Sequence, residues 1–250
     1  MNNNIVKAAE WIKTSEYFVT FTGAGISVES GIPPFRGENG LWSKYNPIFL
    51  DLFYFHNNPK ESWLKIKEIF YDFFGKSNPN PAHYALARLE SEGYLKSIIT
   101  QNIDNLHQKG GNKTVIEFHG NSRTLVCSKC GKIFNFKEEL LNPLPPRCDR
   151  CKGVLKPDFI FFSEPIKPEV YDRSIKESEK ADLYLIIGTT GEIMPASQIP
   201  FIAKNNGAKI IEINIEKSKY TDSITDLFLQ GKASEIMEDI LTEIRKQKVG

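Results

Sequence analysis

The apolar positions of this chain follow two patterns, short uninterrupted runs and helical spacing. Within residues 5–14, apolar side chains recur at intervals of three and four residues, as on one face of an amphipathic helix. Residues 81–92 are also predicted to be helical, and so is the segment between residues 187 and 209. Five runs rich in β-branched and aromatic residues have the length of buried strands: 17–22, 96–100, 158–162, 182–187 and 209–213. Because strands alternate with helices, the pattern predicts the α/β fold class, with a parallel sheet covered on both faces.

Two segments depart from this alternation and are predicted to be insertions. Residues 34–77 are aromatic-rich and helical, and residues 123–156 contain all four cysteines of the chain. Since predicted strands lie on both sides of them, we expect one Rossmann-like sheet domain made of residues 1–33, 78–122 and 157–250, with the two insertions forming a small lobe. In the helical insertion we expect an apolar framework of Leu50, Phe53, Trp63, Ile66, Ile69, Phe70 and Phe73.

Composition and charge exclude several classes of protein. The chain has 250 residues, of which 40% are apolar, so it can bury an ordinary core. Its 32 Lys and Arg balance 31 Asp and Glu, so no long-range field favours nucleic acid or a membrane surface. The first ten residues lack the pattern of a secretory signal, and no window is apolar enough for a membrane helix. We therefore expect a cytoplasmic protein that binds neither membrane nor nucleic acid.

The spacing of the cysteines predicts a metal site. Cys127 and Cys130 form one Cys-x-x-Cys pair, and Cys148 and Cys151 form a second pair after an interval of 17 residues, 131–147. Two such pairs at this distance are typical of a zinc ribbon, and a reducing cytosol disfavours the alternative of disulfides. Four thiolates fill a tetrahedral zinc site and leave no position for water, so we expect one structural zinc ion.

Glycine and polar residues follow four of the predicted strands. Because the carboxyl ends of parallel strands share one edge of the sheet, these residues are expected to meet there. The first loop has two glycines of a G-x-G-x-x-G dinucleotide turn, but Val28 stands where the third belongs. The four strand ends together predict a dinucleotide site with Gly23, Gly25, Gln101, Asn102, Asp104, Gly188, Thr189, Thr190, Gly191, Asn214 and Glu216.

Two histidines near these strand ends are candidates for a general base. His119 precedes Gly120 and lies twelve residues after His107. A histidine at the mouth of such a site can accept a proton near neutral pH. We favour His119, although His107 competes for the role on spacing alone.

The motifs that carry this chemistry resemble those of the sirtuins, the NAD-dependent protein-lysine deacylases. The resemblance runs in order along nearly the whole chain, through GAGISVESGIPPFRG, TQNIDNLHQKGG, EFHGN, the paired Cys-x-x-Cys, FIFFSEP, GTTGEIMPA, INIE and GKASE. It implies a large sheet domain, a small lobe with the zinc ribbon, and NAD consumed as a co-substrate between them. The implied reaction transfers an acyl group from lysine to ADP-ribose and releases nicotinamide and O-acyl-ADP-ribose.

The resemblance also implies a role for each site residue. His119 would be the catalytic base, with Asn102 and Gln101 as further catalytic residues, and Gln101 and His119 would face the ribose hydroxyls. Phe35 would shield the reactive sugar carbon, and Arg36 would approach the phosphates. The nicotinamide pocket would be formed by Ala24, Ile32, Asn102, Ile103 and Asp104. The phosphate, adenosine ribose and adenine would be held by Thr189, Thr190, Asn214, Ile215 and Ala233, with Gly23, Gly25, Gly188 and Glu216 lining the cofactor.

The acyl-lysine substrate would bind along one segment that departs from the family pattern. By resemblance this segment comprises Ile160, Phe161, Phe162, Ser163 and Glu164. Ser163 replaces a glycine usual in the family, so it could reshape the peptide groove. Two further departures are Pro34, for Asp or Thr, and Thr190, for the commoner Ser.

The acyl preference depends on the helical insertion. Sirtuins that prefer acidic acyl groups carry a Tyr and an Arg on the helix lining the acyl pocket, and Ile66 and Ile69 fall at the corresponding places here. We therefore expect acetyl-lysine to be preferred over succinyl-lysine. A register slip of one residue would instead place Lys65 or Lys67 in the pocket.

Two other functions are considered. A sirtuin-like NAD hydrolase or ADP-ribosyltransferase would use the same site with a different nucleophile. A zinc-ribbon nucleic-acid-binding protein is disfavoured, because the basic residues between Cys127 and Cys151 are offset by Glu138, Glu139 and Asp149.

Overall fold

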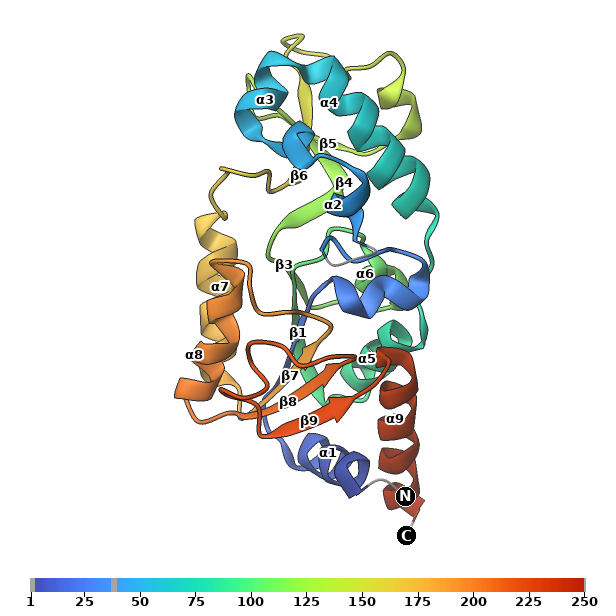
Figure 1. Cartoon of the computed structure of the whole chain (residues 1–250), viewed down its shortest axis with the longest axis vertical. Helices are drawn as coiled ribbons and strands as arrows, with labels where there is room; N and C mark the ends of the chain where they lie inside the picture. Colours follow the sequence, from blue (N-terminus) through green and yellow to red (C-terminus); the bar gives the residue numbers. More distant parts are fainter. Residues whose placement is uncertain (1–2, 37–39, 250) are drawn as a thin grey trace.

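A six-stranded parallel sheet forms the lower half of the molecule in Figure 1, a computed structural model that describes residues 3–36 and 40–249. Its strands lie in the order β3-β2-β1-β7-β8-β9. Numbered among themselves in chain order, the six strands lie in the order 3-2-1-4-5-6, which is the order of a dinucleotide-binding sheet. The strand order switches between β1 and β7, where the chain starts to add strands on the other side of β1. The bounds are β1 (Phe18–Thr22), β2 (Leu95–Thr100), β3 (Val115–Glu117), β7 (Leu183–Ile187), β8 (Lys209–Asn214) and β9 (Leu227–Gln230).

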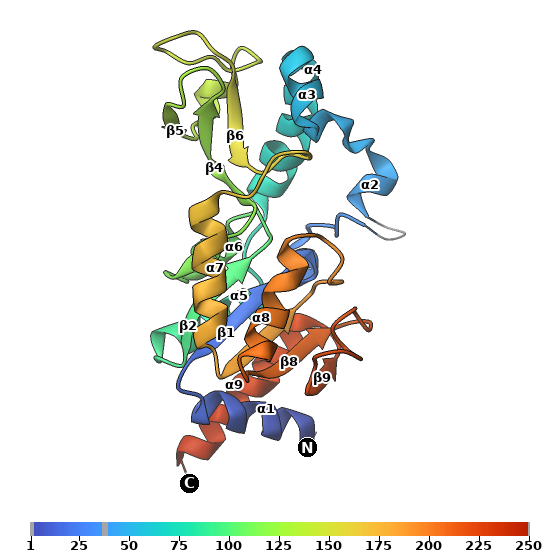
Figure 2. The same cartoon turned by 90° about the vertical axis from the view of Figure 1, so that its left-hand side faces the viewer.

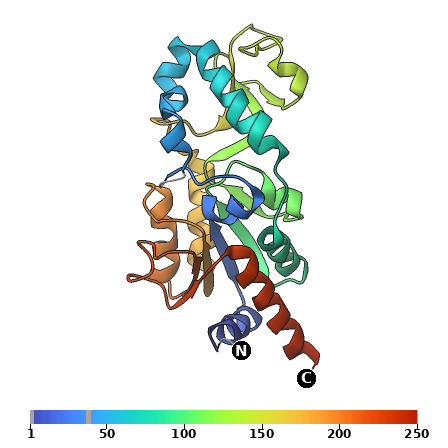
Figure 3. The same ribbon diagram turned by 45° about the vertical axis from the view of Figure 1, so that its right-hand side comes forward.

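Helices cover both faces of this sheet, as the alternating pattern predicts. One face packs against α1 (Asn3–Thr14), α5 (Pro81–Ser91) and α9 (Ala233–Val249), and the other against α7 (Pro168–Lys180) and α8 (Ile199–Asn205). Figure 2 shows α7 and α8 side by side. Figure 3 shows that α9 and both chain ends lie at one end of the molecule. β1 and β7 are buried along their whole length, so their carboxyl ends are held rigidly.

A smaller antiparallel sheet and a group of helices form the other half of the molecule. The sheet has the order β5-β4-β6, with β4 (Gly120–Cys127), β5 (Ile133–Asn135) and β6 (Leu155–Phe159). The helices are α2 (Leu41–Lys44), α3 (Leu52–Asn57) and α4 (Pro59–Ile66), which continues into a π-helical stretch, Lys67–Phe73. Both groups bury side chains in one shared apolar core, in which the Trp63 indole donates a hydrogen bond of 2.8 Å to the carbonyl of Leu155.

The structure corrects the prediction that residues 158–162 are a strand of the parallel sheet. The strand in this region is β6, which ends at Phe159 and pairs with β4 of the small sheet. Phe161 is buried in the core of the small lobe, whereas Phe162 is 44% exposed. Phe159 and Phe161 of this run are therefore buried in the second core and not in the main sheet.

The predicted helical framework is also wrong at two positions. Phe53 is 79% exposed and Phe73 is 52% exposed, while the other five predicted residues are buried. A π-helical turn holds more residues than an α-helical one. The stretch Lys67–Phe73 therefore rotates the inward face, so that Phe74 is buried in place of Phe73.

The start of α5 is tied to the loop after β1. α5 begins after Asn80, whose side chain accepts from the backbone N–H of Ala82 and donates to the carbonyl of Ile26 at 2.7 Å. This anchors the helix to the glycine loop that follows β1. Short helix α6 (Leu106–Gly110) lies beyond the end of β2.

Within the described residues, none of the helices is long and apolar enough to cross a membrane. Gly37, the last residue of the first quoted motif, and the outermost residues of the expected sheet domain, 1, 2 and 250, lie outside the described residues.

Candidate active site

The loops after β1 and β7 touch each other at two glycines, Gly25 and Gly188. The backbone N–H of Gly25 donates to the carbonyl of Gly188 at 2.8 Å. A Cβ atom added to Gly25 would lie 2.6 Å from the Cα of Gly188, and one added to Gly188 would lie 2.4 Å from the Ile26 nitrogen. Gly188 also has a positive φ of 62°. The glycines are therefore required for this close contact at the switch point of the sheet.

The missing third glycine of the dinucleotide motif is explained by the path of the chain. After Gly23 the backbone forms a 3-10 helix, Ala24–Ser30, where a Rossmann turn would open an α-helix against the sheet. Val28 is 44% exposed on this turn, so no close packing requires a glycine there.

Two amide side chains at the end of β2 join these loops. Gln101 Nε2 donates to Thr189 Oγ1 at 3.1 Å, across the sheet. Asn102 is buried, and its Nδ2 donates to the carbonyl of Gly23 at 3.1 Å and to Ser27 Oγ at 3.2 Å. The structure thus brings together the ends of β1, β2 and β7, as the sequence predicts.

A partly buried carboxylate follows these amides. Asp104 accepts from Ser27 Oγ at 2.7 Å and from the backbone N–H of Leu106 at 2.9 Å. Burial raises the pKa of Asp104, while the hydrogen bonds from Leu106 and Ser27 oppose that shift. The Ser27 hydroxyl therefore connects Asp104 to Asn102, a role that sequence reasoning missed although Ser27 lies within the quoted GAGIS motif.

His119 follows β3 and faces the same edge of the sheet. Its Nδ1 lies 3.0 Å from the backbone carbonyl oxygen of Gln101. Because a carbonyl oxygen can only accept, Nδ1 carries the proton and Nε2 keeps its lone pair. Burial lowers the pKa of His119 below its ordinary value, and the hydrogen bond to Gln101 partly opposes this shift. The ring is therefore neutral near pH 7, as a general base requires.

His107, the rival candidate, lies in the interior of the protein. It is 1% exposed, and its Nε2 is 2.9 Å from Thr22 Oγ1. Burial, with His83 nearby as a smaller cause, holds the pKa of His107 well below its usual range. These contacts indicate that His107 packs in the interior of the protein.

The expected phosphate and adenosine residues lie after β7, at the end of β8 and at the start of α9. Asn214 Nδ2 donates to the carbonyl of Thr189 at 3.0 Å, and Asn214 accepts from the backbone N–H of Gly231 at 2.9 Å. Ile215, Glu216 and Thr190 are exposed, and Ala233 is the first residue of α9. The hydroxyl and amide groups at these strand ends suit the phosphates and ribose of a dinucleotide.

The small lobe approaches the site through aromatic residues. The Phe35 ring packs on Trp42 at a centroid distance of 5.4 Å, and Trp42 meets Phe162 at 6.2 Å. Ile32 is buried in the small-lobe core and Ile103 packs against it, while Arg36 is exposed. Trp42, which sequence reasoning did not single out, therefore links the expected cofactor loop to the expected substrate segment.

The segment Ile160–Glu164 is tied to both lobes. The Phe162 N–H donates to the carbonyl of Leu50 at 2.9 Å, and the Ile160 N–H donates to the carbonyl of His119 at 2.8 Å. Glu164 Oε2 accepts from Lys156 Nζ at 2.9 Å and from the Phe161 N–H at 2.8 Å. These contacts hold the segment beside the proposed base.

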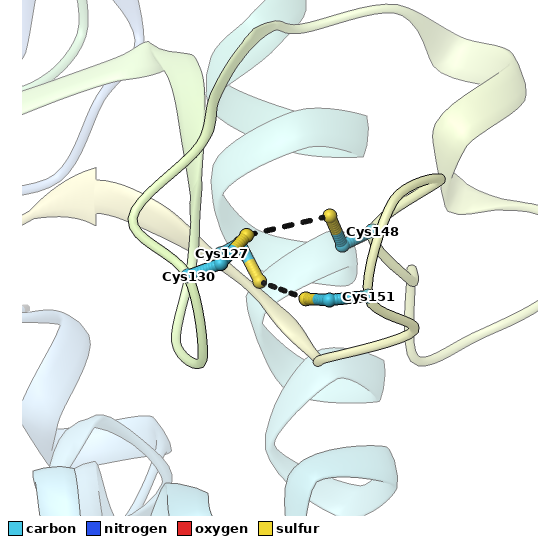
Figure 4. A group of neighbouring side chains, drawn as sticks. All are labelled: Cys127, Cys130, Cys148 and Cys151. Carbon is cyan, nitrogen blue, oxygen red and sulfur yellow. Dashed lines mark hydrogen bonds between the residues drawn. The ribbon is translucent and has the colours of Figure 1, made fainter.

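The four cysteines converge at the end of the small sheet (Figure 4), and their sulfur atoms lie within 4.8 Å of one another. Cys127 Sγ is 3.4 Å from Cys151 Sγ, and Cys130 Sγ is 3.8 Å from Cys148 Sγ. Zn–S bonds of about 2.3 Å in a tetrahedron place sulfurs roughly 3.8 Å apart, so the cluster fits one zinc ion.

Comparisons with known proteins agree with this site. The model of the Sir2 family matches residues 23–195. An NAD-dependent protein deacylase from Pyrococcus abyssi is 43% identical, over 97% of this chain and 98% of the relative. A Sir2 homologue solved with ADP-ribose superposes with a TM-score of 0.91 at 39% identity, covering 97% of each chain. A Sir2 complex with a p53 peptide and NAD+ gives a TM-score of 0.87 at 31% identity, covering 98% of each chain. The chain therefore belongs to the Sir2 family.

Proposed function

We propose that this protein is an NAD-dependent protein-lysine deacylase, which transfers the acyl group to ADP-ribose and releases nicotinamide and O-acyl-ADP-ribose. The observation that carries the proposal is His119, a neutral ring held by the Gln101 carbonyl at the edge of a dinucleotide-type sheet. The names of relatives support it, since they include protein deacylases and complexes with ADP-ribose, NAD+ and a peptide.

The strand ends are proposed to hold NAD, which supplies an electrophilic sugar carbon and nicotinamide as a leaving group. Their hydroxyl and amide groups suit ribose and phosphate oxygens, while buried Asn102 and partly buried Asp104 suit the nicotinamide amide. Phe35 and Ile32 are apolar and would exclude water from the reacting carbon. Arg36, exposed at the start of the following loop, is proposed to approach the phosphates. The remaining proposed contacts are Gly23, Ala24, Gly25, Ile103, Gly188, Thr189, Thr190, Asn214, Ile215, Glu216 and Ala233.

His119 is proposed to take a proton at Nε2 from a ribose hydroxyl, because this nitrogen has no hydrogen on it when Nδ1 donates to Gln101. The Gln101 side chain, bonded to Thr189, would orient the same ribose. The hydroxyl that loses its proton in this way would attack the acyl carbon. The bond between that carbon and the lysine nitrogen then breaks, the lysine amine leaves with a proton, and one water molecule is consumed in the overall reaction.

The acyl-lysine substrate is proposed to bind along Ile160–Glu164, next to exposed Phe162. The lobes are proposed to follow the expected division, with residues 34–77 and 123–156 in the small lobe. Zinc would be structural there, because four thiolates leave no open position for a reactant. A cytoplasmic location is also proposed, because cysteines that are not paired in disulfides are typical of a reducing compartment.

The proposal is tested by incubating the protein with NAD and acetyl-lysine peptides and identifying products by mass spectrometry. We expect equal amounts of deacetylated peptide, nicotinamide and O-acetyl-ADP-ribose. Free ADP-ribose, formed at the same rate with and without peptide, would contradict the proposal and favour an NAD hydrolase.

A further inference from the structure

Glu212 is a buried carboxylate in the middle of the parallel sheet with no assigned role. It lies on β8, two residues before Asn214, and is 0% exposed. Among the described residues no lysine or arginine forms an ion pair with it. Its carboxylate instead accepts from three hydroxyls, Ser218 at 2.5 Å, Thr221 at 2.9 Å and Thr225 at 2.7 Å. A buried carboxylate is costly unless its oxygens are satisfied, so these hydroxyls must stay in place.

All three hydroxyls belong to the 217–225 loop, which joins β8 to β9. Two of them also accept from the loop backbone, because the Tyr220 N–H donates to Ser218 Oγ at 3.0 Å and the Ser218 N–H donates to Thr221 Oγ1 at 2.9 Å. The single carboxylate of Glu212 therefore fixes both the side chains and the backbone of the loop.

The 217–225 loop in turn supports the loop after β7. The Lys219 N–H donates to the carbonyl of Thr190 at 3.1 Å. The Tyr220 ring packs against Gly191, where an added Cβ would come within 2.9 Å of it, and the Tyr220 hydroxyl donates to the carbonyl of Ser197 at 3.1 Å. The chain of contacts thus runs from Glu212 through Ser218 and Lys219 to Thr190.

We propose that Glu212 is a positioning residue for the adenosine and phosphate end of the cofactor. It touches no cofactor atom in this assignment; it holds the 217–225 loop, which holds the Thr189–Glu192 loop in its binding conformation. The inference rests on the proposed NAD site. Loss of the carboxylate or of Ser218 should therefore weaken cofactor binding and leave the proton transfer at His119 unchanged.

The test compares Ser218→Ala, Glu212→Gln and Ser218→Thr with the wild type. For Ser218→Ala and Glu212→Gln we expect the KM for NAD and the Kd for ADP-ribose to rise at least about fivefold, the scale of one lost hydrogen bond. The kcat at saturating NAD and the KM for acetyl peptide should stay within about twofold of wild type. Ser218→Thr keeps the hydroxyl and should behave as wild type.

The matched control is Ser178→Ala. This substitution removes a buried hydroxyl on α7 that lies 3.1 Å from the Tyr184 hydroxyl on β7 of the sheet. It should lower Tm without changing the KM for NAD. The inference is overturned if Ser218→Ala, which is half-buried and should fold, keeps the wild-type Kd for ADP-ribose, or if both variants lose only kcat. A wild-type protein that neither binds ADP-ribose nor consumes NAD would overturn the proposed function itself, before any variant is compared.

Discussion

The Nδ1 atom of His119 lies 3.0 Å from the carbonyl oxygen of Gln101, and this contact fixes the tautomer of the ring. Gln101 also reaches Thr189 through its side chain, so one residue orients the base and joins β2 to β7. A base of this kind needs a neutral ring with Nε2 directed at its substrate, and the backbone carbonyl supplies that orientation without a charged partner.

We predict that His119→Ala lowers kcat for deacetylation by about 10²–10⁴-fold, the usual contribution of a general base. The Kd for ADP-ribose should change little, because the ring is needed for proton transfer more than for affinity. Single-turnover kinetics and calorimetry measure the two effects. As a control, His107→Gln should lower Tm but retain turnover, and the reverse pattern in the two variants would show that His107 is the base.

The pH profile gives a second check on His119. The neutral ring is the active form, and its pKa is lowered by burial, so protonation occurs only below the ordinary value of 6.5. The rate should therefore be constant from about pH 7 upward and fall as the pH drops below 6.5. In the kcat/KM profile this acid limb should disappear in His119→Ala, and an acid limb centred above pH 7 would contradict the assignment.

We predict that Cys148→Ser releases zinc and unfolds the small lobe. Cys148 is fully buried in the core that also contains Trp63 and Leu155. Losing a structural ion removes several kcal/mol of stability, so Tm should fall by roughly 10 °C or more. Metal analysis and calorimetry measure this. A variant that stays folded without zinc, and regains turnover with other Lewis-acid metals, would instead indicate a catalytic ion.

The sequence predicts the strand ends at the candidate site better than it predicts the helices and strands around them. Gly23 and Gly188 directly follow β1 and β7, and these loops are recognisable because glycine and polar residues recur after four strands of one parallel sheet. Phe161 misleads, because an apolar run is equally buried in either core, and only the tertiary structure places it in the small lobe. β9 and β3 are short, at four and three residues, and give little periodic signal.

Phe73 shows a second limit. A 3.6-residue period assigns it to the core, but the π-helical stretch rotates it outward, and nothing in local propensity marks that turn. Glu212 shows a third limit, since its partners Ser218 and Thr225 are ordinary loop residues until the fold brings them to one carboxylate.

We predict that acetyl-lysine is processed at least tenfold better than succinyl-lysine, measured as kcat/KM in competition on one peptide. Ile66 and Ile69 are buried and apolar, and an unpaired carboxylate in such surroundings costs several kcal/mol. Lys65 and Lys67 are already paired with Glu68 at 2.8 Å and Asp72 at 2.7 Å. A higher kcat/KM for the succinyl peptide that disappears in Lys67→Ala would contradict this and implicate that lysine.

The last prediction concerns Ser163, which has a φ of 68° in the substrate segment. A non-glycine residue in the left-handed region costs about 1 kcal/mol or more, so a glycine would be favoured at this position, as the resemblance to the sirtuins implies. Its hydroxyl has one weak contact, 3.4 Å from Asp51 Oδ2, which offsets little of that cost.

Ser163→Gly removes this strain but adds about 0.5–1 kcal/mol of chain entropy in the unfolded state. The two effects nearly cancel, so the free energy of unfolding should stay within about 1 kcal/mol of wild type, whereas Ser163→Val should be clearly destabilising because a β-branched residue tolerates positive φ poorly. Urea unfolding measures both variants. If the Ser163 side chain narrows the peptide groove, Ser163→Gly should also lower the KM for acetyl peptide and leave the KM for NAD unchanged. A Ser163→Val variant as stable as Ser163→Gly would show that the segment readily changes its backbone conformation, and the left-handed residue would then have no part in shaping the groove.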